Sequence, residues 1–209
     1  MSKADQVAGT VRRVIERFAA SSNESKVKAD MANLRRGMDA QGEISPQTWG
    51  IFLEEMPEDL YGKANGMSAA ERAAYTSLSL YAIAQQGNDL KNENQYLEGQ
   101  SLAKALRKYV DMQEQPQREN TQARIEIKMK NALSSKNVDD LGVRLRSLIR
   151  LISSSKYKIP VDYPALAKDL YNYSFPESRA RVRIKWARDF YRLNVATDDI
   201  NKNQKDSKE

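Results

Sequence analysis

The sequence predicts an all-α protein, a two-lobed helical bundle of about eight or nine helices. Apolar residues recur at intervals of three and four along nearly the whole chain, which is the period of a helix. No segment shows the sustained apolar–polar alternation of a half-buried strand. Serines placed as helix caps and glycines placed at helix ends divide the chain into segments of helical length.

Four helices are predicted in the first half of the chain. Gly37 is placed to end the second of them in a left-handed conformation. Ser45-Pro46 has the pattern of a cap followed by the first residue of a short third helix, and Ser68 and Glu71 have capping-box spacing. The predicted helices cover about residues 4 to 20 and 25 to 36, then a short segment carrying Trp49, Phe52 and Leu53, and finally a segment from Ser68 to Gly87.

Five more helices are predicted after a polar surface loop from Gly87 to Gly99. They cover about residues 101–113, 118–134, 138–153, 163–173 and 178–193. Two of them have a well-defined apolar face, formed by Leu141, Leu145, Leu148, Ile149 and Ile152 in one and by Val182, Trp186, Phe190 and Leu193 in the other. We therefore predict an N-terminal helical lobe over residues 1–95 and a basic C-terminal helical lobe over 96–194. Residues 195–209 have too little apolar content to offset the entropy of ordering and are predicted to form a disordered tail.

Positive charge is concentrated in the second half of the chain. Residues 1–100 contain 11 Lys and Arg against 14 Asp and Glu, a net charge of −3, whereas residues 101–194 contain 20 against 10, a net charge of +10. In the last helix, Arg181, Lys185, Arg188 and Arg192 fall at i, i+4, i+7 and i+11, which places them in one stripe. This pattern indicates binding to a nucleic-acid backbone, with a solvated helix face or a contact to a neighbouring subunit as the alternatives.

The composition removes most of the usual parts of an enzyme site. The chain has no cysteine and no histidine, and so lacks a thiolate nucleophile and the commonest general base and metal ligand. A magnesium nuclease built on carboxylates alone is a further alternative, with Glu54, Glu55, Glu58 and Asp59 beside Pro57 as its candidate ligands. We expect no catalytic activity, no metal and no cofactor.

Two segments bear on localisation. The longest uncharged run, from Ala73 to Asn88, is too short and too polar to span a bilayer, which needs ~20 apolar residues. The N-terminus, from Met1 to Asp5, lacks the apolar segment of a signal peptide, and we expect a cytoplasmic protein without a membrane contact.

Eight segments, in this order and spacing, resemble one known family. They are Leu34-Arg35-Arg36; Trp49 with Met56-Pro57; Leu80-Tyr81-Ala82 with Gln85-Gln86-Gly87; Ser101-Leu102-Ala103-Lys104-Ala105-Leu106; Asn131-Ala132-Leu133; Leu145-Arg146-Ser147-Leu148; the run from Asp162 to Tyr171; and the run from Val182 to Tyr191. Over about residues 28 to 193 the chain resembles the CasB family of CRISPR–Cas proteins, the small subunit of the type I-E Cascade surveillance complex.

The resemblance implies a non-catalytic, all-helical protein that works inside a larger assembly. Its partners would be the other Cascade subunits, a second copy of itself arranged head to tail, the guide crRNA and the target DNA. Contacts to the nucleic-acid backbones would stabilise the hybrid of crRNA and target DNA and the open R-loop in antiviral defence.

The candidate nucleic-acid-binding residues are basic side chains predicted to avoid the core. Two have specific structural alternatives: Arg35 and its neighbour could cap carbonyl groups at a helix end, and Arg72 could pair with a nearby carboxylate. The candidates are Arg35, Arg36, Arg72, Lys104, Lys108, Lys128, Lys130, Lys136, Arg144, Arg146, Arg150, Arg181, Lys185, Arg188 and Arg192. A free-standing helical DNA-binding regulator is the alternative function, although it would normally show a separate helix-turn-helix unit.

Overall fold

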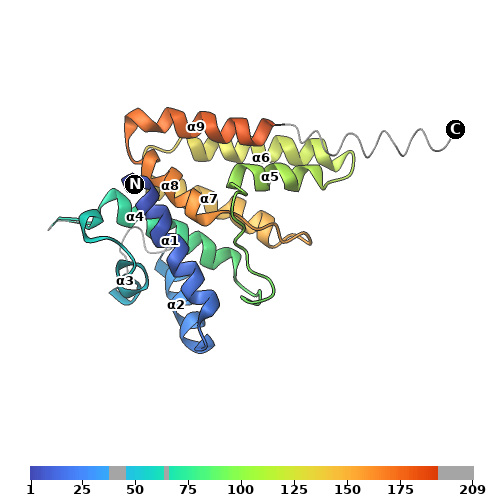
Figure 1. The fold of residues 1–209 in the computed structure, drawn as a ribbon. Helices are drawn as coiled ribbons and strands as arrows, with labels where there is room; N and C mark the ends of the chain where they lie inside the picture. Colours follow the sequence, from blue (N-terminus) through green and yellow to red (C-terminus); the bar gives the residue numbers. More distant parts are fainter. Residues whose placement is uncertain (38–45, 64–65, 193–209) are drawn as a thin grey trace.

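A computed structural model describes residues 1–37, 46–63 and 66–192, and in these residues the protein is all-α (Figure 1). Nine α-helices and one short 3-10 helix, η1 (Glu58–Leu60), occur in the described part of the chain. The α-helices are α1 (Lys3–Ala20), α2 (Glu24–Gly37), α3 (Pro46–Leu53), α4 (Ala69–Ala84), α5 (Leu102–Asp111), α6 (Gln117–Leu133), α7 (Val138–Ser153), α8 (Tyr163–Tyr173) and α9 (Pro176–Tyr191). Ser45, Leu193 and the predicted tail, residues 195–209, lie outside the described residues.

Side-chain caps fix several of the helix starts. At α4, Ser68 Oγ accepts a hydrogen bond from the backbone N–H of Glu71 at 3.0 Å, and Glu71 Oε2 accepts one from the backbone N–H of Ser68 at 2.6 Å. This is the capping box that the sequence predicts, and it satisfies two backbone donors that a helix start leaves free. Ser101, Asn137 and Asp162 cap α5, α7 and α8 in the same way with one side-chain acceptor each.

Gly37 does not have the role predicted for it. It is the last residue of α2 and is absent from the positions with positive φ, whereas Gly87, just after α4, has φ of +81°. A residue with a side chain would not fit at position 37, whatever its backbone conformation. A Cβ there would overlap the hydroxyl of Tyr75 and lie 3.1 Å from its Cζ. The missing side chain lets α2 approach α4 closely.

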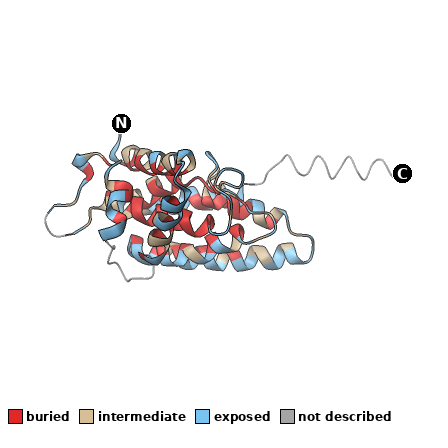
Figure 2. Cartoon of the chain, turned by 90° about the horizontal axis from the view of Figure 1, so that it is seen from below, coloured by how far each residue is buried: buried red, intermediate tan, exposed pale blue. Residues whose placement is uncertain are grey.

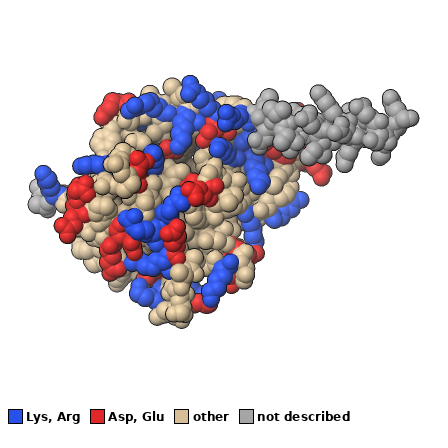
Figure 3. Space-filling model, viewed as in Figure 1, with Lys and Arg blue, Asp and Glu red and all other residues tan. Residues whose placement is uncertain are grey.

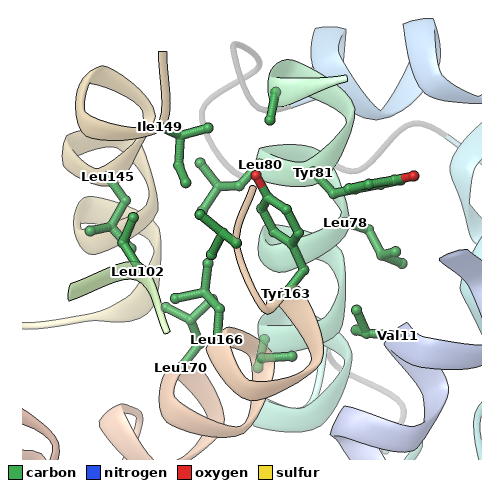
Figure 4. Packing of buried hydrophobic residues seen from close by; sticks show 14 of the residues in the cluster. Val11, Leu78, Leu80, Tyr81, Leu102, Leu145, Ile149, Tyr163, Leu166 and Leu170 are labelled. Carbon is green, nitrogen blue, oxygen red and sulfur yellow. The ribbon is translucent and has the colours of Figure 1, made fainter. Parts of the chain in front are cut away.

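Helix α4 is the centre of the molecule. Thirteen of its 16 residues are buried, and it packs against α1, α2, α7 and α8. Figure 4 shows this packing, with the Tyr81 ring of α4 facing the Tyr163 ring at the start of α8; the ring centroids are 5.2 Å apart in an edge-to-face arrangement. Helix α8 also packs along α1, so one buried cluster runs from Val7 to Phe190 (Figure 2). The division at residue 95 into two lobes stays a prediction.

The remaining helices of the second half, α5, α6, α7 and α9, lie on the side of α8 and α4 away from α2 and α3 (Figure 1). Helix α9 packs on α5 and α8, and α6 packs on α5 and α7. No helix of the described residues is long and apolar enough to cross a membrane.

Candidate nucleic-acid interface

The basic residues of α9 divide into an inward and an outward group. Lys185 is 45% exposed, but we count it with the inward group because its Nζ lies 2.7 Å from Oδ1 of Asp169 on α8. The same carboxylate accepts a hydrogen bond from Nε1 of Trp186 at 2.7 Å. Asp169 is 5% exposed, so the ammonium of Lys185 compensates a buried carboxylate. One of the four cations of the predicted basic stripe is therefore already paired with a carboxylate of the protein itself.

Two further arginines of α9, Arg179 and Arg183, also face inward. Their guanidinium groups lie over the ring of Tyr173, 5.1 and 5.7 Å from the ring centroid. Arg183 donates to the Tyr173 hydroxyl at 3.2 Å, and Arg179 donates to the Tyr173 backbone carbonyl at 3.1 Å. These contacts are cation–π and hydrogen-bond interactions that join α9 to the end of α8.

Arg181, Arg188 and Arg192 form the outward group. All three are exposed and make no ion pair with another described residue. They line a shallow groove with Lys185, Asp189, and the apolar side chains of Ile184 and Tyr191, each 51% exposed. Figure 3 shows basic side chains gathered along the upper edge of the molecule, over α9. At the C-terminal end of α9, burial raises the pKa of Tyr191, and the neighbouring Glu126 of α6 raises it further.

Helix α7 presents two of its three candidate arginines to solvent. Arg144 and Arg150 are exposed, and Arg146 is half-buried. The opposite face of α7, which the sequence predicts as core, is buried at Leu141, Leu145, Leu148, Ile149 and Ile152. Because the apolar face fixes the rotation of the helix, Arg144 and Arg150 have no alternative but to point outward.

Further exposed lysines lie on α5, on α6 and in the connection between α6 and α7. Lys104, Lys108, Lys128, Lys130 and Lys136 are all exposed, and Lys104 donates to the carbonyl of Gly99 at 3.1 Å. The sequence interpretation missed Arg124, which is exposed on α6 one turn before Lys128. The four-residue spacing of Arg124 and Lys128 could have predicted from the sequence that they share a helix face.

We define the outer cations as the exposed basic residues Lys104, Lys108, Arg124, Lys128, Lys130, Lys136, Arg144, Arg150, Arg181, Arg188 and Arg192.

Three candidates from the first half have structural contacts. Arg72 on α4 pairs with Asp139 on α7, with 2.5 Å between Nη1 and Oδ2, so the carboxylate alternative is the observed one. Arg35 Nη1 donates to the carbonyl of Ala82 at 3.3 Å, in the last turn of α4. Arg35 thus caps a helix end, but that of α4 and not of its own helix. Arg36 is exposed and donates to Asn33 Oδ1.

The acidic cluster near Pro57 is engaged with α1. Glu54 pairs with Arg17 at 3.0 Å, and Glu55 pairs with Arg13 at 3.3 Å. Among the described residues, no group of three or more carboxylates is arranged to hold a metal ion. Two of the four candidate ligands therefore serve to join α1 to the segment after α3.

Comparison with known proteins agrees with this helical framework. A family model described as CRISPR-associated protein Cse2 matches residues 30–191. The chain belongs to the Cse2 family. Crystal structures of CasB proteins have the same fold: CasB from Thermobifida fusca is 26% identical, with a TM-score of 0.65 over 92% of this chain and 99% of that chain. This agrees with the family resemblance of the eight sequence segments.

Two more distant structures, both of proteins from Thermus thermophilus, share the fold. A CRISPR-associated protein of the Cse2 family is 20% identical, with a TM-score of 0.62, and a CasB structure is 21% identical, with a TM-score of 0.60. Each alignment covers 91% of this chain and 99% of the other. No curated protein sequence gave a match.

Proposed function

We propose that this Cse2-family protein is the non-catalytic small subunit of a type I-E Cascade complex, in which its outer cations contact the backbones of crRNA and target DNA. Its further partners would be the other Cascade subunits and a second copy of itself, and its place would be the cytoplasm. Its work would be to stabilise the RNA–DNA hybrid and the open R-loop during antiviral defence.

The observation that carries the proposal is the exposure of the outer cations on and beside α5, α6, α7 and α9, in contrast to the partnered cations of α9. Where a cation has a structural partner, as Lys185 has Asp169, its charge is already compensated. The outer cations have no such ion pair among the described residues, and they therefore remain available to a polyanion. Lysine and arginine contacts to phosphate carry no base information, so binding should have little sequence preference.

A modest backbone affinity is enough for this role. The RNA–DNA hybrid is about as stable as the DNA duplex it replaces, so R-loop formation is close to balanced. A few contacts that exist only in the open state then decide how long it lasts. A population shift from about 1:99 to 99:1 requires about 5.5 kcal/mol of preferential binding, a total that several phosphate contacts together can supply.

The proposal is tested in a reconstituted complex that carries Arg144→Glu together with Arg150→Glu. Both side chains are exposed and lie opposite the buried face of α7, so the complex should assemble normally with its guide. Target binding should weaken, and the unpaired DNA strand, probed with permanganate, should close sooner than in wild type. The charge-matched control is Lys26→Glu with Lys63→Glu, two exposed lysines of the acidic half. An R-loop of wild-type lifetime in the α7 variant would contradict the proposal for these residues.

A further inference from the structure

A cavity of about 440 Å³ lies between α1, α2 and the C-terminal end of α4, away from the outer cations. Its apolar wall includes Phe18, Val27, Met31 and Leu90. This volume falls within the range of small-molecule sites, ~300–1,000 Å³. Arg35 of α2 and Gln86, which follows α4, meet in its lining.

The cavity contains a cation without an anionic partner. Arg35 is half-buried and makes no ion pair with another described residue; it donates one hydrogen bond, to the Ala82 carbonyl. Burial lowers the pKa of the Arg35 guanidinium, and the neighbouring charge of Arg36 lowers it further. A guanidinium has five N–H donors, so most of its donors remain for an anion that enters the cavity.

The rim of the cavity carries charges of both signs. Lys28 and Lys91 both lie beside Glu24, at 3.6 and 3.5 Å, and all three side chains are more than 60% exposed. Such exposed pairs are weak and open readily. Asp89, the second carboxylate of the rim, accepts from the backbone N–H groups of Lys91 and Asn92, which together hold its pKa below the usual value. Two lysines against two carboxylates leave the rim neutral, so the net positive charge of the cavity comes from Arg35.

The apolar wall requires a ligand with more than an anionic group. Phosphate alone would leave half-buried Leu90 in contact with water, together with the small exposed parts of Val27 and Met31, which are 8% and 5% exposed. A flat apolar body would cover them, and the exposed amide of Gln86 could bond to polar atoms on its edge. A nucleotide combines a phosphate, a flat body and a hydrogen-bonding edge.

We propose that this cavity binds a single unpaired nucleotide of a nucleic-acid strand, with its phosphate at Arg35 and its base against Met31 and Leu90. The inference rests on the proposed function, because the outer cations would hold the strand from which the nucleotide comes. It adds a contact to a base where the outer cations contact backbone only.

The test titrates the full-length protein with nucleoside 5′-monophosphates, with the matching nucleosides and with inorganic phosphate, followed by NMR chemical shifts. A monophosphate should bind at least tenfold more tightly than the nucleoside or phosphate, with shifts at the cavity residues. Arg35→Gln should abolish the advantage of the monophosphate over the nucleoside, whereas Arg36→Gln, at an exposed neighbour outside the cavity lining, should retain it.

A second pair of variants separates occupancy of the cavity from folding. Ala19 lines the cavity and Ala20, the next residue of α1, does not. Ala19→Trp should block the monophosphate at unchanged helical content, and Ala20→Trp should not. Monophosphate binding that is absent, or that survives Ala19→Trp, overturns the inference. Duplex binding by the same preparation reports on the proposed function separately, because it depends on the outer cations and not on this cavity.

Discussion

Nε1 of Trp186 and Oδ2 of Asp169 are joined by a hydrogen bond of 2.7 Å inside the interface between α8 and α9. Trp186 is 3% exposed, so its N–H has no access to water and depends on this acceptor. Lys185, the preceding residue, donates to both oxygens of the same carboxylate. One aspartate therefore orients α9 and decides which of its faces is left for binding.

Asp169→Ala should lower the free energy of unfolding by about 2–4 kcal/mol, since it leaves a buried indole N–H without an acceptor and removes the partner of Lys185. Lys185→Gln should cost less than about 1 kcal/mol, because Lys185 is 45% exposed and can return to water. Urea unfolding measures both. Equal losses for the two variants would show that the indole hydrogen bond contributes nothing.

Gly37→Ala should destabilise the protein by about 1–3 kcal/mol, because the new methyl group overlaps the Tyr75 hydroxyl and forces α2 away from α4. The double variant Gly37→Ala with Tyr75→Phe should recover part of this loss, since Cζ would still be 3.1 Å away. Thermal unfolding of the single and double variants gives the coupling energy. Additive effects would mean that the two residues do not interact.

The pair of Arg72 and Asp139 should contribute little to stability despite joining α4 to α7. Both side chains are partly exposed, 33% and 48%, and such pairs give about 0.2–1 kcal/mol in double-mutant cycles. Arg72→Ala should also change nucleic-acid affinity less than Arg150→Ala, because the charge of Arg72 is already compensated. A larger effect of Arg72→Ala on affinity would place Arg72 in the interface.

The contact between Asp5 on α1 and Lys168 on α8 predicts a specific acid dependence. A hydrogen bond from Lys168, with a smaller one from Ser2, lowers the pKa of Asp5 from 3.8 to about 2. Because the folded pKa is the lower one, the contribution of Asp5 is complete above pH 3.8 and is lost as the pH falls to 2. Asp5→Asn should therefore lose less stability than wild type between pH 4 and 2. Parallel stability curves would contradict this.

Local sequence signals predicted much of the fold. Ser68 and Glu71 mark the start of α4, and Asp162 marks the start of α8. Their capping hydrogen bonds join residues within four positions of each other, so both partners can be recognised in a short stretch of sequence. The buried faces of α7 and α9 follow from helical period alone, and the buried residues of the described part confirm them.

The site was less predictable because its contacts join distant segments. Lys185 and Asp169 belong to two helices, and so do Arg72 and Asp139; no helical period shows which carboxylate will meet which cation. Arg35 caps α4, 47 residues away in sequence. The prediction for Gly37 used local conformation, whereas the close approach of Tyr75 decides that position. Only the outward orientation of a cation, as at Arg144, can be read from its own helix.

The salt dependence of nucleic-acid binding tests the central claim most directly. For the isolated protein on duplex DNA, the logarithm of the association constant should fall linearly with the logarithm of salt concentration, with a slope of about −0.9 for each phosphate contacted. Combining Arg144→Gln, Arg150→Gln and Arg188→Gln should reduce the size of the slope by about 0.9 for each phosphate that the variant no longer neutralises. Lys26→Gln with Lys63→Gln, in the acidic half, should leave the slope unchanged. An affinity that does not vary with salt, or a slope that the three arginine substitutions do not alter, would contradict the account.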